Sequence, residues 1–154
     1  MSEDEQNAKE DVMFYSNRPS IKIYALKKRV RGRKVDYLSI KKKPINFSVE
    51  VPEKIDLIIP APSSCTFPLR LANKLKFPIH KIKKKSSKKI SQIPINLRGV
   101  VGKELFEIKG NFKNKTILLV DDISTTGATL NCIAEKLIEM GAERVIGLVY
   151  FLNK

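Results

Sequence analysis

The chain has 154 residues, 42% of them hydrophobic, and a formal net charge of +14, which fits one domain of ordinary size with its own core. No apolar stretch approaches the ~18 residues that a membrane span needs, and the acidic beginning is not typical of a signal peptide, so we expect a cytoplasmic protein with no membrane partner. Cys65 and Cys132 form no C-x-x-C pair, which argues against a disulfide framework or a zinc site.

The charge is unevenly distributed along the chain. Residues 1–11 hold five acids and one lysine, so the remainder carries +18. Basic residues cluster at 27–34 (six in eight), 41–43 (three in three) and 81–89 (six in nine). Such clusters predict attraction to polyanions such as nucleic acid, anionic lipid or a polyphosphorylated ligand. A lysine-rich composition with solvated surfaces explains the same clusters equally well.

Base stacking would contribute little to nucleic-acid binding. Aromatic residues make up only 7% of the chain, and tryptophan is absent. We therefore expect any such binding to be weak and independent of base sequence, with the 81–89 cluster as its contact.

The first third of the chain is the least regular. We expect residues 1–13 to form a disordered acidic leader and residues 14–154 to form a single domain. Pro19 is predicted as a first helical residue, and the apolar positions from 20 to about 30 fit a short amphipathic helix loosely. Residues 31–54 have no clear period and are interrupted by prolines.

The central segment alternates strand and helix signals. Ile55–Ile59 is predicted as a buried strand that runs into a tight turn, Pro60–Ser64. Phe67–Phe77 is predicted as a helix, ended by Pro78. Ile79–Ile82 is predicted as a short strand.

Residues 83–99 are rich in lysine, serine and proline and are predicted to be mobile. Val100–Ile108 is predicted as a strand or hairpin, and Asn111–Lys115 as a turn. His80, the only histidine, is expected to have a structural role.

The last forty residues predict a βαβ unit. The apolar run Thr116–Val120 is a strand, Leu130–Met140 has the spacing of an amphipathic helix with Gly141 as its C-cap, and Val145–Leu152 is a second, fully covered strand. Two strands joined in this way are expected to be parallel neighbours. Repetition of the unit predicts an open α/β sheet whose ligand lies at the carboxyl ends of the strands.

The strand 116–120 runs directly into Asp121 and Asp122 and then into the turn Ser124–Thr129. Both carboxylates are expected to be exposed at the strand tip, where they can accept hydrogen bonds from sugar hydroxyls. Gly127 allows the backbone to approach a ligand closely, and the following helix adds unpaired N–H groups and the positive end of its dipole. The pattern therefore predicts a site for a phosphorylated sugar.

Other proteins also place acids after an apolar strand. Receiver domains need further residues on later strands, whereas only 32 residues, none of them Asp, follow Asp122. A Walker B strand needs a G-x-x-x-x-G-K-[ST] loop, which the sequence lacks. A plain helix cap, with Thr125 or Thr126 as N-cap, is the remaining alternative. Two adjacent acids and four hydroxyls exceed what a cap needs, which favours the ligand site.

This motif resembles the PRPP-binding loop of type I phosphoribosyltransferases (PRPP is 5-phosphoribosyl 1-diphosphate). Beyond the motif, the chain is similar to the ComF family of competence-associated phosphoribosyltransferase-like proteins. The residues that carry this wider similarity are Phe14, Tyr15, Leu26, Lys27, Asp56–Pro62, Gln92, Arg98 and Phe106. The resemblance implies an α/β fold with an open, mainly parallel sheet, helices on both faces and a flexible hood.

The resemblance also implies a role for each part of the site. Asp121 and Asp122 would hold the ribose hydroxyls of PRPP. The 5′-phosphate would bind to Ser124, Thr125, Thr126, Gly127, Ala128 and Thr129. Pro62, Ser63 and Ser64 would form the loop that touches pyrophosphate through backbone N–H groups, and residues 84–99 would form the hood.

The implied reaction transfers a phosphoribosyl group to or from a nucleobase-like acceptor. Mg²⁺ would bind together with PRPP, bridging its oxygens, with no ligand directly from the protein. No catalytic residue is assigned, because the acceptor supplies the nucleophile. The alternative is a non-catalytic PRPP-binding accessory protein of competence and DNA uptake that contacts nucleic acid through its basic surface. An oligomer is compatible with the sequence.

Overall fold

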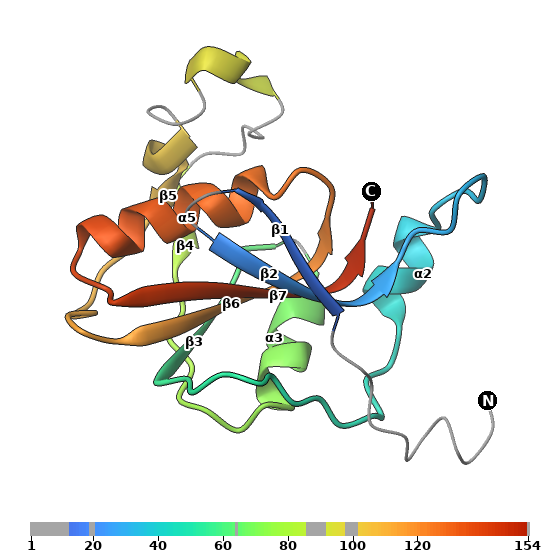
Figure 1. The fold of residues 1–154 in the computed structure, drawn as a ribbon, viewed down its shortest axis with the longest axis horizontal. Coiled ribbons are helices and arrows are strands. Elements are labelled where there is room, and N and C mark those ends of the chain that lie inside the picture. The colour runs from blue at the N-terminus through green and yellow to red at the C-terminus, as the bar shows by residue number, and fades with distance from the viewer. Residues whose placement is uncertain (1–12, 19–20, 64, 86–91, 98–101, 154) are drawn as a thin grey trace.

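The structure is a computed structural model that describes residues 13–18, 21–63, 65–85, 92–97 and 102–153 (Figure 1). Residues 1–12 of the predicted leader lie outside these ranges, as does Pro19. Met13, the last residue of the predicted leader, already belongs to the first strand.

A five-stranded sheet forms the centre of the fold, in the order β1-β2-β7-β6-β3. β2 (Ile21–Lys28), β7 (Arg144–Leu152), β6 (Thr116–Ser124) and β3 (Leu57–Pro60) are parallel to one another. The edge strand β1 (Met13–Arg18) is antiparallel to β2. The predicted open, mainly parallel sheet is confirmed.

Helices cover both faces of this sheet, as predicted (Figure 1). α5 (Ala128–Glu139) packs on one face through Leu130, Ile133 and Leu137, and α3 (Phe67–Asn73) packs on the other. The predicted C-terminal βαβ unit is also confirmed, with β6 and β7 as parallel neighbours.

The helix predicted over residues 20–30 is wrong, because strand β2 runs there instead. Ile21, Ile23 and Ala25 are buried on the α5 side, while Tyr24 and Leu26 are buried on the α3 side. A central strand that is covered on both faces has no alternation of apolar and polar side chains, and its nearly continuous apolar pattern imitates a short helix.

Helix α2 (Tyr37–Lys42) lies in the segment 31–54, for which the sequence predicts no regular element. The Asp36 carboxylate accepts a hydrogen bond from the Ser39 N–H at 3.0 Å and caps the helix. None of its residues is fully buried, so no apolar stripe marks it in the sequence.

The other central elements follow the predictions with shifted ends. The predicted strand 55–59 is β3, and the predicted helix 67–77 ends at Asn73. Lys76 has a left-handed backbone (φ 56°), so the chain turns before it reaches Pro78. The strand predicted at 79–82 is reduced to a single bridge between Ile79 and Ile58.

A small ribbon stands beside α5. β4 (Lys83–Lys84) pairs antiparallel with β5 (Phe106–Glu107), so the strand or hairpin predicted over 100–108 is confirmed in part. The 3-10 turns η2 (Ile95–Leu97) and η3 (Gly102–Leu105) precede β5. Residues 86–91 and 98–101 lie outside the described ranges, and the mobility predicted for 83–99 stays a prediction.

His80 has a structural environment. Its Nε2 lies 2.6 Å from the carbonyl oxygen of Lys109, and its ring meets Phe112 edge-on at 5.1 Å.

Among the helices in the described ranges, none is long and apolar enough to cross a bilayer.

An ionic network joins the loop before β3 to the sheet. The Tyr24 hydroxyl donates to Glu53 Oε2 at 2.7 Å, and Arg144 donates to both Glu53 oxygens at 2.7 and 3.2 Å. Burial and then the Glu53 carboxylate raise the pKa of Tyr24 to about 12. The hydrogen bond from Tyr24 is the largest cause that lowers the pKa of Glu53.

We predict that Tyr24→Phe lowers the free energy of unfolding at neutral pH by about 1.5–3 kcal/mol, the usual value of a hydrogen bond to a charged group. Because the pKa of Tyr24 is raised to about 12 in the folded state, from about 10 when unfolded, wild type loses this advantage as the pH rises through that interval. Urea unfolding at several pH values measures the difference in stability between the two proteins. A difference that stays constant up to about pH 12 would contradict the role of the network.

Candidate functional site

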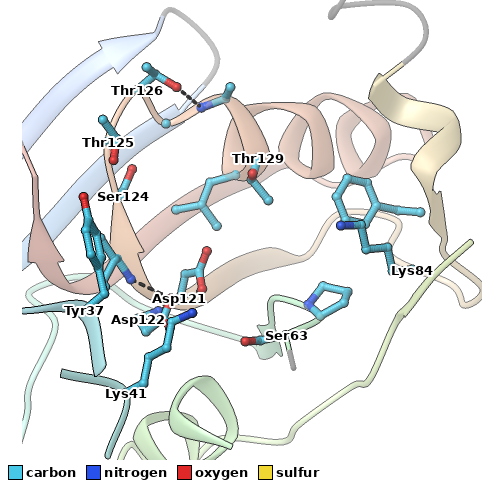
Figure 2. Close-up of a pocket in the computed structure, with 16 residues that line it drawn as sticks. Tyr37, Lys41, Ser63, Lys84, Asp121, Asp122, Ser124, Thr125, Thr126 and Thr129 are labelled. Carbon is cyan, nitrogen blue, oxygen red and sulfur yellow. Dashed lines mark hydrogen bonds between the residues drawn. The ribbon is translucent and has the colours of Figure 1, made fainter. Parts of the chain in front are cut away.

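A pocket of about 680 Å³ opens at the carboxyl ends of β6 and β3 (Figure 2). It brings together nearly all of the residues predicted for the sugar phosphate site, together with several that were not predicted. The lining residues are Tyr37, Lys41, Pro62, Ser63, Lys84, Phe106 and Asp121 to Leu130 without interruption. This is the edge of the sheet where a parallel α/β fold is expected to bind its ligand.

The two acids lie side by side at the tip of β6 but differ in exposure. Asp121 is half-buried, whereas Asp122 is only 7% exposed, so the prediction that both are exposed is wrong for Asp122. The loop after β3 lies against Asp122, and the Cys65 thiol of this loop donates to Asp122 Oδ2 at 3.4 Å. Its other oxygen accepts from the Ile123 N–H at 2.7 Å.

The surroundings of Asp121 disfavour its ionised form. Burial raises the pKa of the Asp121 carboxyl well above its ordinary value, and the adjacent Asp122 carboxylate raises it further. The Asp122 N–H, which donates to Asp121 Oδ1 at 2.8 Å, and then Lys41, on α2, partly offset this rise. A pocket of this kind favours a ligand that donates hydrogen bonds, such as a sugar hydroxyl, or a cation that sits beside the acids.

The turn after β6 has a backbone conformation that requires glycine. Gly127 has φ 77°, in the left-handed region, and it is the N-cap of α5 in place of Thr125 or Thr126. Thr126 Oγ1 accepts from the Ala128 N–H at 3.2 Å. Within the described ranges, the N–H groups of Thr126, Gly127 and Thr129 have no hydrogen-bond partner. These donors, with the helix dipole behind them, form a cradle for an anion.

Two further polar atoms near the turn are buried without a partner among the described residues, Ser124 Oγ and Asn153 Oδ1. Asn153 holds the turn to α2, because its Nδ2 donates to Tyr37 Oη at 2.7 Å and to Thr125 Oγ1 at 3.4 Å. Buried polar atoms normally have partners. Ser124 lines the pocket, so its unpaired hydroxyl lies next to the space that a ligand would occupy.

The predicted pyrophosphate loop reaches the same pocket. Pro62 and Ser63 line it, and Ser64 lies outside the described residues. Ser63 Oγ accepts from the Cys65 N–H at 3.2 Å, which turns the loop back toward Asp122.

Six lining residues were not among the predicted site residues. Two of them, Ile123 and Leu130, flank the predicted turn, and the other four come from elements elsewhere in the chain. Tyr37 and Lys41 enter from α2, and Lys84 enters from the small β4–β5 ribbon on the opposite side (Figure 2). Phe106 belongs to β5 of the same ribbon. The i, i+4 spacing of Tyr37 and Lys41, which puts two side chains on one face of a helix, was the available signal. It has meaning only once residues 37–42 are known to be helical.

Comparison with known proteins identifies the family. A model of the phosphoribosyl transferase domain matches residues 22–154, and the chain therefore belongs to this family. The predicted resemblance to phosphoribosyltransferases is confirmed at this level, whereas the resemblance to ComF proteins stays a prediction. No curated protein matches the chain.

Two solved structures are similar to the chain. One is a purine phosphoribosyltransferase from Pyrococcus horikoshii Ot3, with 25% identity and a TM-score of 0.44 over 64% of this chain and 70% of that one. The other is a hypoxanthine phosphoribosyltransferase from Staphylococcus aureus, with 17% identity and a TM-score of 0.41 over 66% of this chain and 54% of that one. Both TM-scores are low, and the family membership rests on the domain match.

Proposed function

We propose that the pocket binds PRPP and that the protein transfers the phosphoribosyl group to or from a nucleobase-like acceptor. Pyrophosphate is released when the group goes to the acceptor and is consumed when PRPP is formed from it. The observation that carries the proposal is the meeting of two acids and an unpaired N–H turn in one pocket. PRPP has sugar hydroxyls beside a terminal phosphate, which is the same pairing of chemical groups.

The ribose and the 5′-phosphate would occupy the β6 end of the pocket. Asp121 and Asp122 would accept hydrogen bonds from the ribose hydroxyls. The 5′-phosphate would accept hydrogen bonds from the unpaired N–H groups of Thr126 and Gly127 in the turn. The Ser124 hydroxyl would donate a hydrogen bond to an oxygen of the ligand. Thr125 and Thr129 contribute hydroxyl groups to the same wall.

The pyrophosphate would lie toward the loop after β3. Pro62 and Ser63 line that side of the pocket, and Lys41 and Lys84 bring positive charge to it from opposite walls. This chemistry needs no nucleophile from the protein. The chain would hold the sugar, stabilise the departing pyrophosphate and exclude water while the acceptor attacks the anomeric carbon.

The residues present fit a magnesium ion that arrives with PRPP. The described residues contain no group of three or more His, Cys, Asp or Glu that could hold a metal alone, but the Asp121 and Asp122 carboxylates supply the negative charge and the oxygen chemistry that Mg²⁺ prefers. Asp121 and Asp122 would lie beside an ion bound with PRPP, and such an ion would supply positive charge toward the pyrophosphate group.

Lys41 offers a test of the pyrophosphate side. We predict that Lys41→Met weakens PRPP binding by about 10-fold, the loss of about 1.5 kcal/mol for one hydrogen bond to a charged group. Lys42→Met is the matched control, because Lys42 lies on the same short helix but is exposed and outside the pocket. Equal affinities for PRPP in the two variants, measured by calorimetry, would remove Lys41 from the site.

The alternative is a non-catalytic PRPP-binding protein of the ComF type whose basic surface meets nucleic acid. The net charge of +14 favours it. A screen of nucleobases for pyrophosphate release from PRPP separates the two functions. Release that depends on one base supports the transferase, whereas PRPP binding without release for any base supports the accessory protein.

A further inference from the structure

The loop between β2 and α2 carries a second functional surface, which we call the basic arm and define as residues 27–34. It holds six basic residues in eight. The longer segment 27–43 holds nine basic residues and one acid, Asp36, so it carries a net +8 of the chain's +14. Figure 1 shows the arm extending away from the sheet beside α2.

The basic side chains of the arm are exposed, and four of the six have no ion-pair partner among the described residues. All six basic side chains are exposed to solvent. Arg29, Arg31, Arg33 and Lys34 form no ion pair with any residue in the ranges that the structure describes. The nearby Asp36 uses its carboxylate to cap α2.

The arm is a closed turn with an anchored base. The Arg29 N–H donates to the Leu152 carbonyl at 2.9 Å, which ties the arm to β7. The Arg33 N–H donates to the Val30 carbonyl at 3.1 Å, and Arg29 Nε donates to the Arg33 carbonyl at 3.4 Å. Gly32, at the tip, has φ +82°, and a Cβ built there meets no atom within 4 Å. Nothing in the described chain covers the tip.

Arginine distinguishes the arm from the other basic clusters of this lysine-rich chain. Only seven of the chain's 30 basic residues are arginines, yet three of the seven fall between residues 29 and 33. The guanidinium group binds phosphate with two parallel hydrogen bonds, which lysine cannot do.

We propose that the basic arm binds the phosphodiester backbone of nucleic acid without reading base sequence. The proposal does not rest on the PRPP site. It differs from the sequence-based prediction, which placed a nucleic-acid contact at 81–89. Glu107, on β5 beside the described part of that cluster, interacts with Lys83 and Lys85 as well as with Lys109, its ion-pair partner at 2.9 Å, so part of the charge of the cluster is already offset.

The test compares three triple variants. Arg31→Gln, Arg33→Gln and Lys34→Gln together remove three charges from the arm. Lys54→Gln, Lys113→Gln and Lys115→Gln remove three exposed charges that precede β3 and β6. These residues lie at the amino ends of the parallel strands, whereas the arm follows the carboxyl end of β2. Lys81→Gln, Lys83→Gln and Lys85→Gln remove three from the ribbon side. Fluorescence anisotropy with a duplex DNA and with a single-stranded RNA of mixed sequence measures affinity across a salt series.

We expect the arm variant alone to lose at least about tenfold in affinity. The slope of the logarithm of the binding constant for duplex DNA against the logarithm of the salt concentration should become less steep by about 2.7, which is about 0.9 for each of the three phosphates that is no longer neutralised. The DNA and RNA titrations show which source of phosphodiester the protein prefers. Equal losses in all three variants, a loss confined to the ribbon variant, or undiminished binding in the arm variant would overturn the proposal. So would equal or tighter binding to vesicles that contain phosphatidylserine. Asp121→Asn should leave nucleic-acid binding intact, which keeps this test separate from the PRPP site.

Discussion

Replacement of Asp121 and Asp122 together by Asn is expected to weaken PRPP binding by at least about 100-fold. Each carboxylate is proposed to accept a hydrogen bond from a ribose hydroxyl, and a hydrogen bond to a charged group contributes about 1.5–3 kcal/mol. Titration calorimetry of the double variant measures the loss. Affinity within about threefold of wild type would contradict the ribose site.

The single substitution Asp121→Asn separates the role of this acid in ligand binding from its effect on the stability of the fold. Its folded-state pKa is raised, first by burial and then by Asp122, so its ionised form disfavours the folded state. The stability that it contributes is present below the unfolded value of about 4 and is lost as the pH rises through the folded value. We therefore expect Asp121→Asn alone to raise the free energy of unfolding at neutral pH, by about 0.5–2 kcal/mol as for other functional-site substitutions.

The increase should disappear as the pH falls below about 4, since wild-type Asp121 is then largely neutral in both states. Asp122→Asn serves as the comparison, because Asp122 is buried and accepts hydrogen bonds from Ile123 and Cys65. We expect that variant to lose stability. A single Asp121 variant that is both less stable and weaker in binding would point to a structural role for this acid.

Gly127→Val is expected to abolish binding of the 5′-phosphate, with at least about 100-fold loss of PRPP affinity from two or more N–H donors displaced from the anion. The φ of 77° at this position favours glycine, and a β-branched side chain there costs about 1–3 kcal/mol of strain. The turn is expected to relax to a negative φ and to point its N–H groups away from the pocket.

Gly32→Val is the matched control for that substitution. Gly32 has a similar φ of +82° in an open loop, with no atom within 4 Å of the Cβ, and it lies outside the pocket. Both variants should lose a comparable free energy of unfolding, but only the Gly127 variant should lose PRPP. Parallel losses of PRPP affinity in the two variants would mean that strain, and not the phosphate cradle, determines the effect.

The βαβ unit and the site motif were predictable from sequence because both depend on local order. A strand, two acids, a glycine turn and an amphipathic helix follow one another directly from Thr116 to Glu139, so their relative positions need no long-range contact. The parallel pairing of β6 with β7 follows from the short connection between them.

The parts that sequence reasoning missed depend on contacts between distant segments. Strand β2 is recognisable only once β7 lies beside it and both faces are covered. Burial of Asp122 follows from Cys65, 57 positions earlier in the chain. Lys41 reaches the pocket only because the polar helix α2 is held beside the turn by the bond between Tyr37 and Asn153.

One pocket at the carboxyl ends of the strands is proposed to bind PRPP. The most direct measurement is a calorimetric titration of the wild-type protein with PRPP in the presence of Mg²⁺, with ribose 5-phosphate and pyrophosphate titrated separately. We predict saturable binding of PRPP with one site per chain, weaker binding of ribose 5-phosphate at the same site, and loss of both in the Gly127→Val variant. No heat of binding for PRPP, or binding that survives in that variant, would contradict the claim.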